Sequence, residues 1–311
     1  MKKVLLFTAA ALLSSVCFFS CNKNNGGSTE EPTKEPAKLE DPVHVSDAMT
    51  INFKLVDATT TISVDKYKVQ PQKVIFTESG RYVFIGVIKE ITKAGKGVGE
   101  TFTKTGKYSK NSDGSYQMPG VGSVSTASNP GQGSSTQTQA SITDTSGATT
   151  SFDSTVSDAP STSGGNDKNM VRSWVPEGNV HVDITSKNVS TNVGPSMESI
   201  AKYLADHGVN VNVEEYVGYV IEDITMSKAD NSFIIAFQNS DAYVGNWDWS
   251  NTTQGSFTYH FETELAGELI SGDADGSVSF YSENNVNKCD FGMSASAKGV
   301  TASLSLTLRE E

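Results

Sequence analysis

The sequence predicts an all-β fold with one short helix, in which an antiparallel meander closes into a barrel. The first observation is hairpin spacing, because short apolar segments alternate with turn residues from Val74 to Val124. The second is the C-terminal region 289–308, where apolar and polar residues alternate. Such strands have one buried and one solvated face, as in antiparallel sheets. A meander loses its open edges by closing into a barrel, and a two-sheet β-sandwich is the alternative.

A repeated order of elements organises the rest of the chain. Between Asp223 and Phe261 a strand pair is followed by a Gly-x-aromatic step at Gly245–Trp247, a turn and a further strand. The same order occurs between Val74 and Met118, with its Gly-x-aromatic step at 106–108. We therefore expect residues 43–125 and 171–311 to be two repeat halves of one barrel.

The N-terminal residues carry an export signal. Residues 1–20 contain two lysines, then an apolar run over 4–13, which is the layout of a secretory signal peptide. Ser20-Cys21 resembles the end of a bacterial lipoprotein signal, in which a small residue precedes a cysteine that is lipidated and becomes the new N-terminus. The resemblance implies that Cys21 carries palmitate-type acyl chains and attaches the protein to a lipid membrane. We expect an outer-membrane lipoprotein of the cell envelope, facing the periplasm or the surface; an ordinary cleaved signal is the alternative.

Two polar segments predict disorder. Residues 21–42 have almost no apolar side chains to bury, so we expect a disordered tether. Residues 126–170 are rich in Ser, Thr, Gly, Asn, Asp and Gln, and we expect a low-complexity disordered insertion. Within the insertion, Asp153-Ser154-Thr155 resembles the O-glycosylation site of Bacteroidetes envelope proteins.

One helix is expected at residues 195–207. Gly194-Pro195-Ser196 provides its start and Gly208 its end. Apolar residues recur at helical spacing between Met197 and Leu204, so one stripe of the helix should face a core.

Composition and motifs weigh against several functions. A net charge of −12 disfavours binding to nucleic acid. The four histidines show no metal-ligand spacing, so we expect neither a metal nor a cofactor. Asp273-Ala274-Asp275-Gly276 resembles the start of a calcium loop but is better explained as a hairpin turn. The sequence lacks a Gly-x-Ser-x-Gly nucleophile motif, and Cys289 lies on an apolar strand face, so we expect a protein that is not an enzyme. We also expect a monomer.

Together these features resemble a known family. The lipoprotein signal, the strand pairs with a turn glycine, the Gly-x-aromatic steps at 106–108 and 245–247, and the alternating C-terminal pair are similar to lipocalin-like, calycin-type lipoproteins of Bacteroidetes. The resemblance covers residues 74–124 and 171–308. It implies a lipocalin-like barrel that binds a small apolar molecule in its interior, and it transfers no catalytic residue.

An aromatic cluster is the candidate ligand site. Tyr243, Trp247 and Trp249 share one strand face, and Phe257, Tyr259 and Phe261 share a face of the next strand. In one interpretation Tyr243, Trp247, Trp249 and Tyr259 bind a small apolar molecule or a glycan. In the other, the aromatics fill the core. The chain would then be a structural or protein-interaction component of the envelope with a packed barrel.

Overall fold

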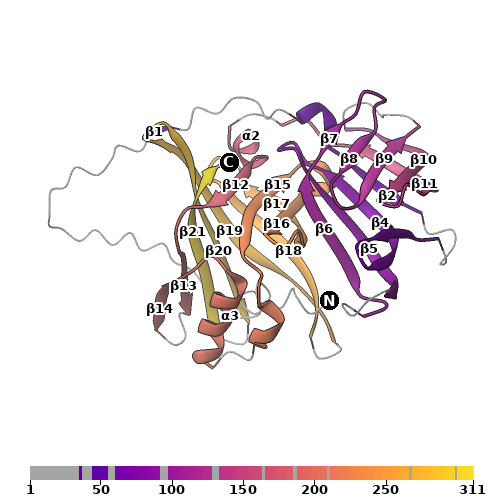
Figure 1. Cartoon of the computed structure of the whole chain (residues 1–311). Helices are drawn as coiled ribbons and strands as arrows, with labels where there is room; N and C mark the ends of the chain where they lie inside the picture. Colours follow the sequence, from indigo (N-terminus) through magenta and orange to yellow (C-terminus); the bar gives the residue numbers. More distant parts are fainter. Residues whose placement is uncertain are drawn as a thin grey trace. The chain divides into compact units, whose positions relative to one another are not determined.

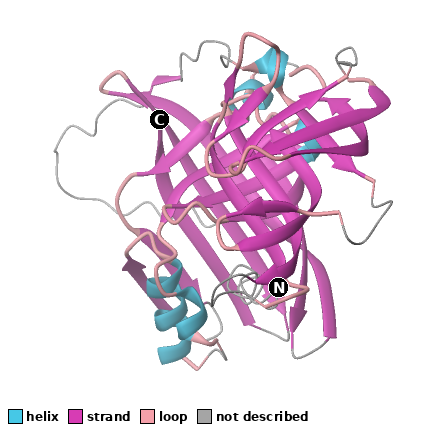
Figure 2. Ribbon diagram, turned by 45° about the vertical axis from the view of Figure 1, so that its right-hand side comes forward, coloured by secondary structure: helices cyan, strands magenta, loops and turns pink. Residues whose placement is uncertain are grey.

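The computed structural model describes residues 35–36, 44–54, 60–91, 97–127, 133–162, 165–184, 188–208, 211–265, 268–297 and 300–311. Cys21, the predicted signal peptide and most of the predicted tether lie outside these residues. The described residues form two compact units, one within Asp41–Ser173 and Glu222–Asn246, the other within Trp174–Ile221 and Trp247–Glu311, together with Glu35–Pro36 (Figure 1). Both units consist mainly of strands, and strands are the main element in the ribbon view (Figure 2).

A ten-stranded antiparallel sheet forms most of the first unit. Its strands are β2 (Met49–Phe53), β3 (Ile62–Val64), β4 (Tyr67–Phe76), β5 (Arg81–Ile91), β6 (Thr101–Lys107), β7 (Ser109–Lys110), β8 (Tyr116–Met118), β9 (Gly122–Thr126), β10 (Ser135–Asp144) and β11 (Thr149–Asp158). They pair in the order β6-β5-β4-β2-β11-β10-β9-β8-β7, and β3 pairs with β4. Alternate residues face one core, in which Phe76, Tyr82 and Phe84 are fully buried.

The predicted disordered insertion at 126–170 is wrong where the structure describes it. β10 and β11 pair from Ser135↔Ser157 to Thr143↔Thr149, and β11 also pairs with β2. In β10 and β11 every second side chain is polar and faces outward. Only the inward-facing positions can join the core, so a few apolar residues are enough to form these two strands. The inward-facing residues Ala140, Ile142, Phe152 and Val156 join the core of the first unit.

Ser154 also faces inward. It is 1% exposed, and its hydroxyl donates to the backbone carbonyl of Thr138 at 3.3 Å. The glycosylation-like sequence Asp153-Ser154-Thr155 therefore does not present that serine on the surface of the folded chain.

Residues 222–246 cover the second face of β4 and β5 within the first unit. The packed residues are Ala48, Ile75, Val83, Ala159, Ala229, Ile234 and Ala242. Beside them Arg81 and Asp223 form an ion pair with side chains 3% and 0% exposed. The Ser173 hydroxyl donates to the same carboxylate at 2.8 Å. The segment is thus fixed by apolar packing and by a buried, hydrogen-bonded ion pair.

An eight-stranded antiparallel barrel closes as the sequence predicts. The remaining strands are β1 (Glu35–Pro36), β12 (Ser173–Pro176), β13 (Val180–Ile184), β14 (Val189–Val193), β15 (Ile221–Ser227), β16 (Ser232–Phe237), β17 (Ala242–Asn251), β18 (Ser256–Leu265), β19 (Glu268–Glu283), β20 (Val286–Ala297) and β21 (Val300–Glu310). The hydrogen-bonded ring runs β12-β15-β16-β17-β18-β19-β20-β21 and returns to β12. β13 and β14 extend the sheet from β21, and β1 pairs with β19.

The two expected repeat halves therefore do not share one barrel. The strands of 43–125 pair in the ten-stranded sheet, whereas those of 171–311 pair in the sheet that contains the closed barrel. The reason is that β10 and β11, which lie in the expected insertion, are themselves strands. β10 pairs with β11, and β11 pairs with β2, so the strands of 43–125 complete their own sheet with them.

In the described parts of the chain, helices are few and short. They are α2 (Asn166–Met170), α3 (Met197–Asp206) and the 3₁₀ segments Val45–Asp47, Val213–Tyr216 and Ala229–Asn231. α3 falls inside the expected range 195–207; the Ser196 hydroxyl accepts a hydrogen bond from the backbone N–H of Ser199 at 3.1 Å and so caps it. It lies beside β14 in the second unit (Figure 1). Among the described residues, no helix has the length and hydrophobicity to cross a bilayer.

Candidate functional site

The predicted aromatic ligand residues are used in packing. Trp247 is 1% exposed and Tyr259 is fully buried, while Trp249 is half-buried. The rings of Trp247 and Trp249 meet edge to face at 5.2 Å between centroids, and the Phe257 ring lies 6.4 and 6.5 Å from them. Tyr243 belongs to the first unit and is 7% exposed there. These indoles fill the core of the second unit instead of lining an open platform.

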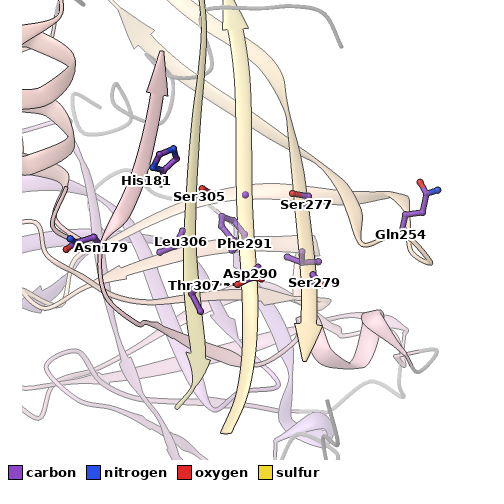
Figure 3. Close-up of a pocket in the computed structure, with 12 residues that line it drawn as sticks. Asn179, His181, Gln254, Ser277, Ser279, Asp290, Phe291, Ser305, Leu306 and Thr307 are labelled. Carbon is purple, nitrogen blue, oxygen red and sulfur yellow. Dashed lines mark hydrogen bonds between the residues drawn. The ribbon is translucent and has the colours of Figure 1, made fainter. Parts of the chain in front are cut away.

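An open depression of about 460 Å³ lies on the wall formed by β19, β20 and β21 (Figure 3). The strand register arranges its polar lining in two cross-strand rows. The first row is Ser277, Gly292, Ser305 and His181. The second row is Ser279, Asp290 and Thr307. Asn179 and Gln254 lie at its two ends (Figure 3). Because the rows are two residues apart along each strand, they share one sheet face.

The opposite face of the same strands is apolar. Val278, Phe291 and Leu306 form the row between the two polar rows, so alternation directs their side chains to the other side. Phe291 is 4% exposed, and its ring lies 5.8 Å from that of Phe257. The wall therefore separates a packed apolar interior from a polar outer surface.

Gly292 makes the floor of the depression. It is the central residue of the first row and leaves an area without a side chain between Ser277 and Ser305. A Cβ at this position would lie 2.9 Å from the Ser277 hydroxyl oxygen and would otherwise meet only a backbone oxygen at 3.9 Å. A larger residue could therefore fill the depression from the strand itself.

Asp290 is held in a fixed orientation. The Thr307 hydroxyl donates to its Oδ1 at 3.0 Å (Figure 3). The Tyr281 hydroxyl donates to the same oxygen at 3.0 Å. Tyr281 is 7% exposed, so this support comes from a side chain with little freedom. Carboxylates that already accept from rigid donors are well suited to bind a further polar group in one orientation.

The imidazole of His181 is also oriented. Its Nδ1 lies 3.0 Å from Asn192 Oδ1, and its Nε2 lies 3.0 Å from the Ser190 hydroxyl. Both partners lie on β14, so the ring is fixed at the edge of the depression beside Ser305.

Other titratable groups of the second unit lie outside the depression. The half-buried His260 contacts Asp273 through Nδ1 at 2.7 Å and Asp248 through Nε2 at 3.4 Å. The hydrogen bond to Asp273 is the main cause that raises the pKa of His260. Cys289 is 1% exposed, and burial raises the pKa of its thiol, as expected of a core cysteine. Within the described parts of the chain, no His, Cys, Asp and Glu side chains gather as a metal site would require.

Sequence reasoning did not identify the depression. Asp290, Gly292, Ser303 and Ser305 were visible as the polar half of an alternating pattern, which predicts only a solvated face. The register between β19, β20 and β21 determines which of these residues are neighbours, and it follows from pairings among distant residues. The lone glycine in a strand was the one signal that could have directed attention here.

No family model matches the chain, and no curated protein does. One solved structure with some likeness is isotype 1 transferrin binding protein B from serogroup B Neisseria meningitidis, with 8% identity and a TM-score of 0.25. The match covers 85% of this chain and 63% of that chain, so the chain spans less than two thirds of that protein's length. The barrel agrees with the fold that the resemblance to lipocalin-like lipoproteins implied, while membership of that family stays a prediction.

Proposed function

We propose that this chain is a membrane-tethered binding protein of the cell envelope, without catalytic activity, that binds a glycan on the outer wall of its barrel. The observation that carries the proposal is the pair of polar rows around Gly292. They lie on the face opposite the packed aromatics, so a ligand reaches them without opening the barrel.

The chemistry of the lining suits a carbohydrate. Serine and threonine hydroxyls both donate and accept hydrogen bonds, the amides of Asn179 and Gln254 do the same, and the Asp290 carboxylate accepts. Sugar hydroxyls need such a mixture of donors and acceptors. The volume of about 460 Å³ falls within the range of about 300–1,000 Å³ that is typical of small-ligand sites.

A small apolar ligand in the barrel interior receives less support. Its predicted contacts were Trp247, Trp249, Tyr259 and Tyr243. Trp247 and Tyr259 are at most 1% exposed, and burying an aromatic side chain in a packed core is itself a large contribution to stability.

Attachment through Cys21 is a separate part of the proposal. It is supported by the apolar run followed by Ser20-Cys21. Cys21→Ala should release the chain from the membrane fraction of expressing cells and prevent incorporation of labelled palmitate. Unchanged membrane partitioning of this variant would exclude acylation at Cys21 as the anchor.

The glycan proposal is tested with an array of envelope and host glycans. The full chain is compared with Gly292→Leu, which places a side chain on the floor of the depression, and with Ser125→Leu, which adds the same apolar bulk to an exposed position on β9. We expect a defined set of glycans to bind the wild type and Ser125→Leu. The same glycans should not bind Gly292→Leu. If no glycan binds the wild type, a protein-interaction role for the outer wall becomes the better explanation.

A further inference from the structure

The charge distribution around the depression points to a narrower ligand class. Of the described residues that line it, Asp290 is the one carboxylate, and neither lysine nor arginine is among them. Anionic sugars such as uronic acids would therefore meet a carboxylate and no compensating cation. A ligand that presents a positive charge would gain an ion pair.

Further carboxylates flank the depression on the same face. The cross-strand row next to Gly292 is Asp275, Ser294, Ser303 and Asp183. It lies two residues along each strand, or roughly 7 Å from the first polar row. Asp275 is exposed, so it adds negative potential at the entrance. The chain as a whole carries a net charge of −12, which acts in the same direction.

The cations on the other side do not cancel this field. The row beyond Asp290 contains Tyr281, Lys288 and Arg309. The Lys288 ammonium is compensated by Glu177 at 2.8 Å and by Glu283 at 2.6 Å. Arg309 is exposed and offsets one negative charge at this distance. Asp290, Asp275 and Asp183 together outnumber it on this face, so the balance of formal charge stays negative.

We propose that the glycan bound in this depression carries a free amino group, which pairs with Asp290; this inference rests on the proposed function. Asp290 receives hydroxyl donors from Thr307 and Tyr281 on Oδ1, which fixes the plane of the carboxylate toward the depression. The ammonium group of an amino sugar donates to the carboxylate, while its ring hydroxyls bond to the serine rows. N-acetylation of the sugar removes the charge and adds bulk, so it weakens binding.

The test uses three tetrasaccharides as probes: a glucosamine oligomer, its fully N-acetylated form and a galacturonic acid oligomer. Binding to the full chain is measured by titration calorimetry at low and moderate ionic strength. We expect the glucosamine oligomer to bind roughly tenfold tighter than the acetylated form, in line with one charge-assisted hydrogen bond. We expect no measurable binding of the galacturonic acid oligomer, and a smaller preference at the higher salt concentration.

Two variants test whether Asp290 causes the preference for the amino form. Asp290→Asn keeps the shape and the acceptor oxygen but removes the charge, so it should abolish the preference for the amino form while neutral binding persists. Asp206→Asn removes a carboxylate from an exposed position on α3, outside the depression, and should leave the preference intact. Equal melting temperatures of the three proteins show that the comparison reports binding and not folding.

The outcomes separate this inference from the proposed function. Equal affinity for the amino and acetylated oligomers, or a preference that survives in Asp290→Asn, overturns the amino-group inference and leaves glycan binding in place. Binding of the galacturonic acid oligomer alone also overturns it. Absence of binding by all three probes and by the glycan array contradicts both statements.

Discussion

Phe257 on β18 lies directly across from Gly276 on β19, and its ring occupies the space that a side chain at position 276 would need. The same ring lies 5.8 Å from that of Phe291 and 6.4 Å from that of Trp247. Neighbours on several sides prevent the ring from moving away. At this level the barrel interior is filled by side chains, which leaves its outer wall as the accessible surface.

A methyl group at position 276 should therefore destabilise the fold. For Gly276→Ala we expect a loss of about 1–3 kcal/mol in the free energy of unfolding, the usual cost of overpacking a core. Gly292→Ala is the matched control on the neighbouring strand, because its Cβ would meet the rotatable Ser277 hydroxyl. Urea denaturation of both variants makes the comparison. Equal stability of the two would argue that the interior has room beside Phe257.

The two indoles of the aromatic cluster should differ in their effect. Trp247 is 1% exposed, so Trp247→Ala should cost about 3–5 kcal/mol of stability. Trp249 is half-buried, and Trp249→Ala should cost less. Thermal and urea unfolding of the two variants measure the difference. A Trp247→Ala variant as stable as wild type would mean that this indole borders unfilled space, and the interior ligand site would return as a candidate.

The hairpin of β10 and β11 should be required for folding of the first unit. Ile142 is fully buried in the core, so Ile142→Ala should cost about 2–5 kcal/mol. Gln137→Ala, on the exposed face of the same strand, should change stability by no more than about 0.5 kcal/mol. Replacing 126–169 by a short Gly/Ser linker should abolish cooperative unfolding of this unit. A linker variant with an unchanged melting temperature would contradict the assigned pairing of β11 with β2.

That hairpin also shows where sequence reasoning succeeds and fails. The alternation over 289–308 was strong enough to predict two strands of the barrel, because Leu, Phe and Met mark its buried face. In β10 the inner face carries Thr136, Thr138, Ala140, Ile142 and Asp144, of which only Ala140 and Ile142 are apolar, while the outer face is Ser, Thr and Gln. Threonine favours strands as well as loops, so hydrophobic periodicity alone could not separate a two-faced hairpin from a disordered segment.

The candidate site was beyond sequence reasoning for a different reason. The aromatic residues drew attention because of their size, but size favours the core. The depression consists of small polar residues that look ordinary one by one. Ser277, Gly292 and Ser305 lie 13 to 15 residues apart in sequence and become neighbours only through the strand register.

Stability should depend on pH through Glu78. The carboxyl is 1% exposed, and burial raises its pKa above the ordinary value of 4.5, although the Ser227 hydroxyl donates to it at 2.6 Å and the Lys228 backbone N–H at 3.0 Å. A raised folded pKa means that the folded state binds the proton more tightly than the unfolded state. The contribution of Glu78 to stability is therefore greatest at low pH and falls as the pH rises from about 4.5 through the folded pKa.

Glu78→Gln removes this titration. The difference in unfolding free energy between the variant and the wild type should shift in favour of the variant with rising pH, by up to about 1.4 kcal/mol per pH unit. Urea titrations between pH 4 and pH 8 measure it. Parallel stability curves for the two proteins would show that Glu78 has the same pKa in both states.

The most direct test of glycan binding on the outer wall is the dissociation constant of the best glycan from the array, measured by calorimetry for wild type, Gly292→Leu and Trp249→Ala. A ligand in the depression predicts that Gly292→Leu weakens binding by at least about a hundredfold, equivalent to roughly 2.7 kcal/mol, while Trp249→Ala leaves it within twofold. Undiminished binding by Gly292→Leu, together with a large loss of affinity in Trp249→Ala, would contradict glycan binding in the depression. It would place the ligand at the aromatic cluster.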